Sequence, residues 1–114
     1  MTDDEVYLRH ILESLERVAA YTAGGREDFM RNRMAQDATV RNLEVVGEAT
    51  KRLSPEFRSA HPEIPWRNMA RMRDVLNHDY MGVDLEIVWE VVENRLTPLR
   101  DQLLSFLETD DRWP

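Results

Sequence analysis

The sequence predicts an all-α protein, a compact bundle of four to five helices in one domain spanning residues 1–114. Three observations indicate this fold class. Apolar residues recur at intervals of three and four along most of the 114-residue chain. No segment alternates apolar and polar residues in the manner of a half-buried strand. Glycine and proline residues interrupt the chain where one helical pattern stops and the next begins.

The first helix is expected to begin at Thr2, because Thr2 and Glu5 have the spacing of a capping box. The pair Gly24-Gly25 should end the run. Between these ends, one apolar stripe faces the predicted core and consists of Leu8, Ile11, Leu12, Leu15, Val18 and Ala19.

A second long helix is predicted from about Asp28 to Leu53, where Ser54-Pro55 stops it. Its apolar face includes Met34, Ala38, Val46, Ala49 and Leu53. Gly47 lies inside this pattern, where glycine costs about 1 kcal/mol relative to alanine. Close approach of a neighbouring helix would offset this cost.

Residues 55–65 contain three prolines, so we expect a loop there with at most one short turn. Pro65 is suited to the first position of a third helix, which "MGVD" at residues 81–84 should end. Asp84 is then expected to cap a final helix, and Pro98 should kink it or split it in two. The apolar stripe of this helix is Leu85, Val88, Trp89, Val92, Leu96, Leu99, Leu103 and Phe106.

Several classes of protein are excluded by composition. No run of eighteen uncharged apolar residues is present, so no membrane span is expected. The opening residues "MTDDEVYLRH" are acidic and lack the basic and apolar regions of a signal peptide. Cysteine is absent, which rules out disulfides and thiolate metal sites. We therefore expect a soluble cytoplasmic protein.

The charge is negative overall and unevenly distributed. A net charge of −7 argues against a protein that coats nucleic acid nonspecifically. Residues 83–114 carry eight acidic against three basic side chains, whereas residues 65–80 carry three arginines against two aspartates. Fourteen of the fifteen basic residues are arginine, which suits planar recognition of phosphate or carboxylate better than lysine. Solvation of two helix faces explains the acidic residues equally well.

The segment "RMRDVLNHDY", residues 71–80, holds the strongest candidate cluster. Arg73 can hold a phosphate and stabilise charge developing on it, and His78 can exchange a proton near neutral pH. On a continuous helix, five residues turn through about 140°, so these two side chains would diverge. They converge if the helix ends near Asn77, or if a symmetric partner supplies a second copy. The simpler alternative is a surface ion pair of Asp74 with His78, with Arg73 bonded to a core carboxylate.

Other candidates are weaker. His10 is expected to be solvated on the first helix, and His61 to lie in the proline-rich loop. Glu86, Glu90 and Glu93 recur at helical spacing and favour a solvated face rather than a magnesium site. No His, Asp or Glu spacing matches a zinc site, and no glycine-rich phosphate loop is present, so no cofactor is expected.

The octapeptide "RDVLNHDY" resembles the Arg-x4-His-x-Tyr signature of HepT-like toxins, a branch of the HEPN superfamily of helical ribonucleases. Three further segments resemble the same family in the same order, so that the resemblance covers roughly residues 5–107. They read "DATVRNLEVVGEATKRLSPE", "HPEIPWRNMARMRD" and "YMGVDLEIVWEVVENRLTPLRDQL".

The resemblance implies a helical homodimer whose motifs face a shared cleft and cut RNA without a metal ion. It implies that Arg73 and His78 form the catalytic pair, with Asn77 and Asp79 supporting the geometry of the segment. It also implies a partner, a minimal nucleotidyltransferase (MNT) antitoxin that transfers AMP onto Tyr80. An anionic nucleotide on that tyrosine would fill the cleft and repel RNA phosphate.

One residue departs from the family's pattern, which often has asparagine after the motif arginine. Asp74 stands there and either orients His78 and favours its charged form, or repels phosphate and weakens activity. A second function of a different class therefore stays open, in which the chain is a non-catalytic partner and substrate of a nucleotidyltransferase. A plain dimerisation domain is a third alternative, in which the motif is coincidental.

Overall fold

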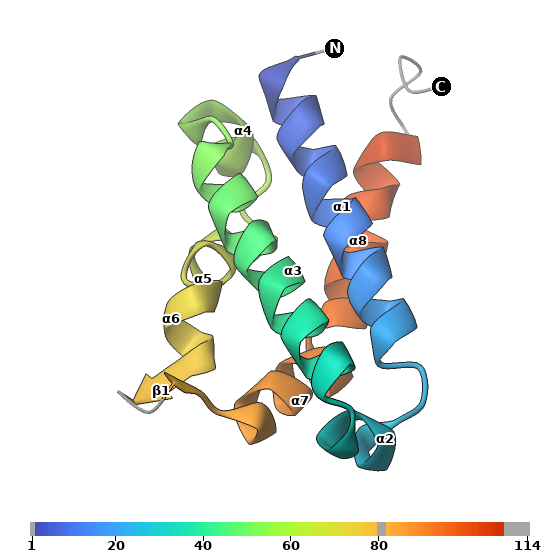
Figure 1. The fold of residues 1–114 in the computed structure, drawn as a ribbon. Coiled ribbons are helices and arrows are strands. Elements are labelled where there is room, and N and C mark those ends of the chain that lie inside the picture. Colours follow the sequence, from blue (N-terminus) through green and yellow to red (C-terminus); the bar gives the residue numbers. More distant parts are fainter. Residues whose placement is uncertain (1, 80–81, 109–114) are drawn as a thin grey trace.

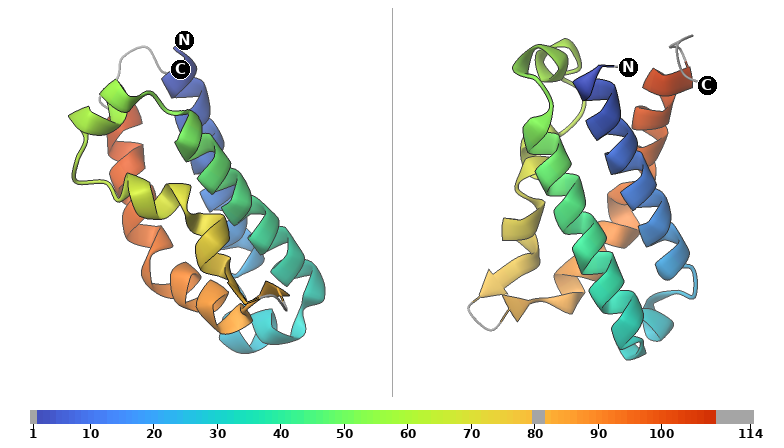
Figure 2. Two further views of the ribbon diagram at one scale, coloured as in Figure 1. Left: turned by 90° about the vertical axis from the view of Figure 1, so that its left-hand side faces the viewer. Right: turned by 45° about the horizontal axis from the view of Figure 1, so that its top comes forward.

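The computed structural model describes residues 2–79 and 82–108, and these form a helical bundle (Figure 1). The two longest helices, α1 (Asp3–Tyr21) and α3 (Arg33–Arg52), lie side by side and run in opposite directions (Figures 1 and 2). A second layer consists of α5 (Trp66–Ala70) and α6 (Met72–Leu76) along α3, and of α8 (Leu96–Glu108) along α1. The described residues thus confirm the all-α class.

Helix α1 begins as the capping box predicts. The backbone N–H of Glu5 donates to Oγ1 of Thr2 at 3.2 Å, and the N–H of Thr2 donates to Oε2 of Glu5 at 3.2 Å. Five of the six residues of the predicted stripe are buried, but Ala19 is exposed, which corrects its assignment. The helix ends at Tyr21, and Gly25, with φ of 90°, allows the turn that follows.

The continuous helix predicted from Asp28 to Leu53 is wrong. The segment forms two helices, α2 (Arg26–Arg31) and α3, separated by Asn32 in an extended conformation. Oδ1 of Asn32 accepts the N–H of Ala35 at 3.0 Å, so this residue caps α3 instead of continuing α2. Met34 is also corrected: its side chain is 84% exposed, and the next residue, Ala35, is the one that faces the core from the first turn of α3.

Gly47 lies where another helix approaches α3, as its position in the sequence predicted. A Cβ atom built on Gly47 would lie 3.3 Å from the carbonyl oxygen of Met69 and 3.6 Å from Cβ of Met72. The absence of a side chain therefore lets α5 and α6 pack directly against the backbone of α3.

The proline-rich segment is more ordered than the predicted loop, because it contains helix α4 (Pro55–Ala60). Oγ of Ser54 accepts the N–H of Phe57 at 3.1 Å and caps this helix. Both the N–H and the hydroxyl of Ser54 donate to the carboxylate of Asp4 at 2.7 Å, which ties α4 to the start of α1. Pro65 is the N-cap of α5 rather than its first helical residue.

The final helix is split, as the position of Pro98 predicted. Asp84 caps α7 (Leu85–Asn94), and its carboxylate accepts the N–H of Glu86 at 2.9 Å. The chain then turns at Arg95, and Pro98 is the third residue of α8, where a missing N–H removes no intrahelical hydrogen bond. The helices of the described residues number eight rather than four or five, because three predicted helices are each broken once and α4 is added.

The core is one cluster of buried apolar side chains. Every helix except α4 contributes at least one fully buried residue to it. Phe29 of α2 is buried and packs against the ring of Trp89, with ring centroids 5.5 Å apart. Val91 is buried although it lies outside the predicted stripe, whereas Leu85, Trp89 and Phe106 are partly buried at its edge. Within the described ranges, no helix is long and apolar enough to cross a membrane.

Candidate functional site

The segment that holds the candidate motif is a broken helix followed by a short strand pair. Helix α5 stops at Ala70, α6 runs from Met72 to Leu76, and β1 (Asn77–Asp79) begins directly afterwards. The prediction that the third helix continues to residues 81–84 is therefore wrong. Asparagine and aspartate at 77 and 79 have low helix propensity, which favours the end of the helix at this point.

Strand β1 pairs with β2 (Gly82–Val83) in antiparallel orientation, with Asn77 opposite Val83 and Asp79 opposite Gly82. Gly82 has φ of 111°, a conformation that side chains other than glycine rarely adopt. The N–H of Asp84 donates to the carbonyl oxygen of Leu76 at 3.1 Å, which fixes the base of the strand pair at the end of α6. This strand pair was not predicted from the sequence, because two or three residues are too few for a periodic signal.

Arg73 lies on the solvent side of α6. A helix continued from Trp66 and Met69 at spacings of three and four would place Arg73 on or beside the apolar face, but its side chain is 66% exposed. The apolar face of this segment is formed instead by Trp66, Met69, Met72 and Leu76. Nε of Arg73 is 3.9 Å from Oε2 of Glu44 on α3, and the Glu44 side chain is 30% exposed. An ion pair of this length and exposure is weak, so it orients Arg73 without committing the guanidinium to one partner.

Glu44 is a residue that the sequence analysis did not single out. One alternative from the sequence bonded Arg73 to a carboxylate in the core. The partner is instead a partly exposed carboxylate, from the middle of α3 and 29 positions earlier in the chain. Asp74, the other acidic residue near Arg73, is exposed. Two carboxylates are thus near the candidate phosphate-binding arginine. Glu44 contacts it from another helix, and Asp74 is the next residue in the sequence.

The remaining motif residues are placed by their backbone. Asn77, His78 and Asp79 form β1, immediately after the last residue of α6. Tyr80 lies outside the described residues. A continuous helix would rotate the chain by about 140° between Arg73 and His78. Because α6 ends at Leu76, only the first three of these five steps are helical. Convergence of Arg73 and His78 was expected to require that the helix end near Asn77. The end of α6 at Leu76 meets this requirement at the level of the backbone.

A groove runs along α3 beside this segment. It has a volume of about 450 Å³ and carries Glu44 and Val83 on its wall. We call it the α3 groove, and its lining is Arg33, Gln36, Asp37, Val40, Arg41, Glu44, Val83 and Leu85. Nε of Arg33 lies 3.5 Å from Oδ1 of Asp37, so positive and negative groups alternate within the groove.

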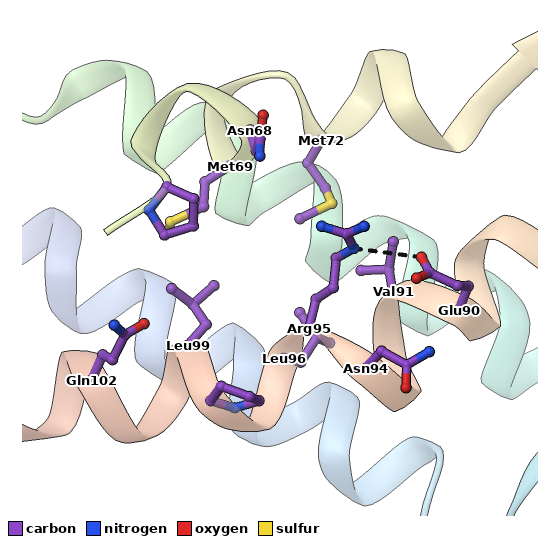
Figure 3. A pocket seen from close by; sticks show the side chains of 12 residues that line it. Asn68, Met69, Met72, Glu90, Val91, Asn94, Arg95, Leu96, Leu99 and Gln102 are labelled. Carbon is purple, nitrogen blue, oxygen red and sulfur yellow. Dashed lines mark ion pairs between the residues drawn. The ribbon is translucent and has the colours of Figure 1, made fainter. Parts of the chain in front are cut away.

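A second pocket, of about 480 Å³, lies between α5–α6 and α7–α8, and none of the described motif residues lines it (Figure 3). Its floor is apolar and includes Met69, Met72 and Leu99. An ion pair of Arg95 with Glu90, at 3.5 Å, lies at one end. An apolar floor and a neutralised arginine do not suit a phosphate, so this pocket is not the candidate site.

The weaker candidates occupy other surfaces. His10 is exposed on α1, as predicted, and His61 follows α4 with its ring between those of Phe57 and Phe106. Among the acidic residues of α7, Glu86 pairs with Arg26, Glu90 with Arg95, and Glu93 accepts the indole N–H of Trp89 at 3.0 Å. Within residues 2–79 and 82–108, no three His, Asp or Glu side chains are grouped as metal ligands are.

Comparison with known proteins identifies a family. The family described as Ribonuclease HepT-like matches residues 11–106. A "Probable ribonuclease HepT" of Thermococcus cleftensis is 43% identical over 95 residues, which cover 82% of this chain and 86% of that protein. A candidate RNase of Caldanaerobacter subterraneus subsp. tengcongensis is 39% identical over 105 residues, covering 91% of this chain and 94% of that protein.

A further relative is a longer protein. It comes from Methanocaldococcus jannaschii, and its name joins gamma-glutamylcyclotransferase with a candidate RNase. The two sequences are 43% identical over 111 residues, which make up 96% of this chain and 50% of that protein. The chain therefore spans half the length of this relative. No solved structure gives a significant match to the chain.

Proposed function

The chain belongs to the HepT-like ribonuclease family, and from that premise we propose that it is a metal-independent RNA endonuclease with Arg73 and His78 as its catalytic pair. The observation that carries the proposal is the end of α6 at Leu76, between the two residues. Arg73 is exposed on the last turn of that helix. His78 lies after the helix, in strand β1. This break removes the geometric objection to a joint role.

The chemistry needs a proton carrier and a cation at one phosphate. The 2′-hydroxyl of the RNA attacks the adjacent phosphorus, a new bond forms between phosphorus and O2′, and the bond between phosphorus and O5′ breaks. His78 takes the proton of the attacking hydroxyl or gives a proton to the departing 5′-oxygen. Arg73 donates to the non-bridging oxygens, where negative charge grows in the transition state. The products are a 2′,3′-cyclic phosphate and a 5′-hydroxyl.

A homodimer would complete this site, because the reaction uses both a general base and a general acid and each chain contributes one motif histidine. The surface beside the motif supports such an interface. Met34 is 84% exposed and Val83 is 38% exposed, and they are the exposed large apolar side chains of the described residues. Val83 lines the α3 groove, and Met34 lies two helical turns from Arg41 of the same groove. Burial of both residues against a second copy would bring two motifs together.

Regulation by a nucleotidyltransferase antitoxin completes the proposed toxin–antitoxin role. Tyr80 is the residue after Asp79 in sequence and is the AMP acceptor that the family motif implies. In the transfer, the tyrosine oxygen bonds to the α-phosphorus of ATP, pyrophosphate leaves, and Tyr80 gains a negatively charged phosphodiester and a purine nucleoside. Like charges then repel the RNA backbone, and the nucleotide occupies the cleft. A Tyr80→Phe chain should stay toxic when the antitoxin is present, whereas the parent chain should be neutralised.

The second candidate function, a non-catalytic partner and substrate of the nucleotidyltransferase, is favoured by the acidic groups near Arg73. Glu44 pairs with the guanidinium at 3.9 Å, and Asp74 is its neighbour in sequence. Both carboxylates compete with phosphate for the arginine. In this alternative Arg73 docks the partner protein, and the chain cuts no RNA.

The test is incubation of the purified chain with total RNA in EDTA, beside His78→Ala and Arg73→Ala variants. The chain must come from cells that lack the antitoxin and must have the mass of the unmodified sequence. We expect loss of cleavage by at least about 100-fold in His78→Ala, because general acid–base catalysis contributes this much. His10→Ala, at an exposed histidine on α1, is the matched control and should cleave as the parent does.

Equal cleavage by the parent and by His78→Ala would refute the assignment of the catalytic pair. Absence of cleavage by a folded, unmodified parent chain would favour the partner-binding function instead. In that case Asp74→Asn, which restores the residue common in the family, tests whether the extra carboxylate is responsible.

A further inference from the structure

A second groove concentrates positive charge on a chain whose net charge is −7. It lies between α4 and α5, is open to solvent and has a volume of about 430 Å³. We call it the arginine groove, and its lining is Pro55, Arg58, Ser59, Trp66, Arg67, Ala70 and Arg71. Three of these seven residues are arginines, and none is acidic.

The three guanidinium groups have no carboxylate partner among the described residues. The α3 groove differs in this respect, because two carboxylates, Asp37 and Glu44, line it beside its arginines, and Arg33 pairs with Asp37. Unpaired cations that share one groove repel each other and attract a diffusible anion. The arginine groove is therefore suited to an anionic ligand, whereas the α3 groove carries its own counter-charges.

The spacing of the three arginines is set by buried structure. The N–H of Arg71 donates to the carbonyl of Arg67 at 3.1 Å, so these residues lie one helical turn apart at the end of α5. Beneath them the indole N–H of Trp66 donates to the carbonyl oxygens of Arg58, at 3.1 Å, and His61, at 2.9 Å. These bonds join the start of α5 to the end of α4, so the two walls of the groove are held together.

Trp66 also decides what kind of contact the groove can make. Its side chain lines the base of the groove but is only 7% exposed and packs against Phe57, with ring centroids 5.8 Å apart, so too little of the ring is accessible to stack on a base. The remaining polar groups at the surface are guanidinium groups and the hydroxyl of Ser59, which are donors to phosphate oxygens. Contacts of this kind hold a nucleic-acid backbone without reading its sequence.

The arginine groove and the candidate catalytic segment lie along the same two successive helices, α5 and α6. Helices α5 and α6 run in succession from α4 to β1 (Figures 1 and 2). Arg71 is two residues before Arg73, and at 1.5 Å of rise per residue it lies roughly 8 Å along the axis from Leu76. A strand of a few nucleotides is long enough to touch both places.

We propose that Arg58, Arg67 and Arg71 bind the backbone phosphates of a single-stranded RNA and thereby position the strand on Arg73 and His78. The inference rests on the ribonuclease function proposed above and adds to it a binding surface outside the motif. The guanidinium fork matches the oxygens of a phosphate in bidentate geometry, which explains why the groove is lined by arginine.

The test measures RNA binding in a His78→Ala chain, so that cleavage does not interfere. The affinity for fluorescently labelled single-stranded RNA is compared between this chain and one that also carries Arg67→Ala and Arg71→Ala. Both arginines are exposed, whereas Arg58 is partly buried and is left unchanged to protect the fold. The control carries Arg17→Ala and Arg31→Ala, which remove the same charge from exposed positions on α1 and α2.

We expect the groove variant to bind at least about tenfold more weakly, and equally so for RNAs of different sequence. The slope of log affinity against log salt concentration should fall by about 1.4, because each phosphate contact on a single strand contributes about 0.7. The control variant should keep the slope of its parent. Arg67→Lys with Arg71→Lys should recover part of the lost affinity, because charge is retained without the bidentate geometry.

Equal weakening in the groove and control variants would overturn the proposal, because net charge alone would then explain the loss. Unchanged RNA affinity, or no RNA binding by the parent, would also overturn it. If RNA binding is unchanged but the variant loses its complex with the nucleotidyltransferase, the groove is a protein interface. The nuclease function fails separately: a parent chain that binds RNA through the groove and cuts none supports the groove and refutes the catalytic proposal.

Discussion

Substitution of Gly47 by valine should destabilise the protein by forcing the motif-bearing helices away from α3. A Cβ atom at this position already lies 3.3 Å from the carbonyl oxygen of Met69 and 3.6 Å from Cβ of Met72. The two methyl groups of valine extend a further bond length toward these atoms, so α5 and α6 must shift. Such overpacking costs about 1–3 kcal/mol.

The helix propensity of valine offsets part of this cost. Valine is roughly 0.4 kcal/mol better than glycine inside a helix, which leaves a net loss of about 0.6–2.6 kcal/mol. For a chain of 114 residues, this corresponds to a fall in Tm of roughly 2–11 °C. Urea unfolding followed by tryptophan fluorescence measures the loss directly, because Trp66 and Trp89 are at least partly buried.

Two substitutions on the same helix serve as controls. Gly47→Ala adds only the Cβ atom, and its gain in helix propensity of about 1 kcal/mol opposes the tight contact, so the change should stay within about 1 kcal/mol. Glu48→Val places valine at the next, exposed position and should cost at most about 1 kcal/mol, since its ion pair with Lys51 is exposed. A loss in Gly47→Val no greater than that in Glu48→Val would refute the close approach.

Three further predictions concern other parts of the fold and the proposed dimer. Trp66→Phe leaves two carbonyl oxygens without the indole donor and should lower the free energy of unfolding by about 1–3 kcal/mol; an unchanged urea midpoint would contradict this role. Asn32→Ala removes the N-cap of α3 and should cost about 1 kcal/mol in the same assay, whereas Asn32→Asp should cost little. Met34→Glu should convert the proposed dimer to a monomer in sedimentation analysis and reduce RNA cleavage, while the control Gln102→Glu, at an exposed position of α8, should not. A Met34→Glu chain that stays dimeric would place the interface elsewhere.

The weak ion pair of Arg73 with Glu44 links the fold to the proposed chemistry. It holds the arginine toward α3 through a residue in the middle of that helix, which gives the guanidinium a defined direction before RNA arrives. An incoming phosphate carries a full negative charge and a matched set of oxygens, so it competes well with a carboxylate at 3.9 Å. Glu44 is thus compatible with a positioning role as well as with inhibition.

Features that depend on hydrogen bonds within a few residues were predicted from the sequence. The capping box of Thr2 and Glu5, the cap at Asp84 and the division of the last helix near Pro98 are all confirmed. The close approach at Gly47 was also predicted, because glycine inside a helix is unfavourable unless another backbone needs the space. The residues of the candidate site came from the resemblance of residues 71–80 to a family motif.

Features that depend on contacts between distant residues were decided by the tertiary structure. The end of α6 at Leu76 rests on a strand pair and on a bond from Asp84, neither of which has a periodic signal in the sequence. The partner of Arg73 comes from another helix, and the arginine groove forms because Trp66 joins α5 to α4. A local pattern specifies a helix through its own backbone, but only packing determines which side chains of different helices meet.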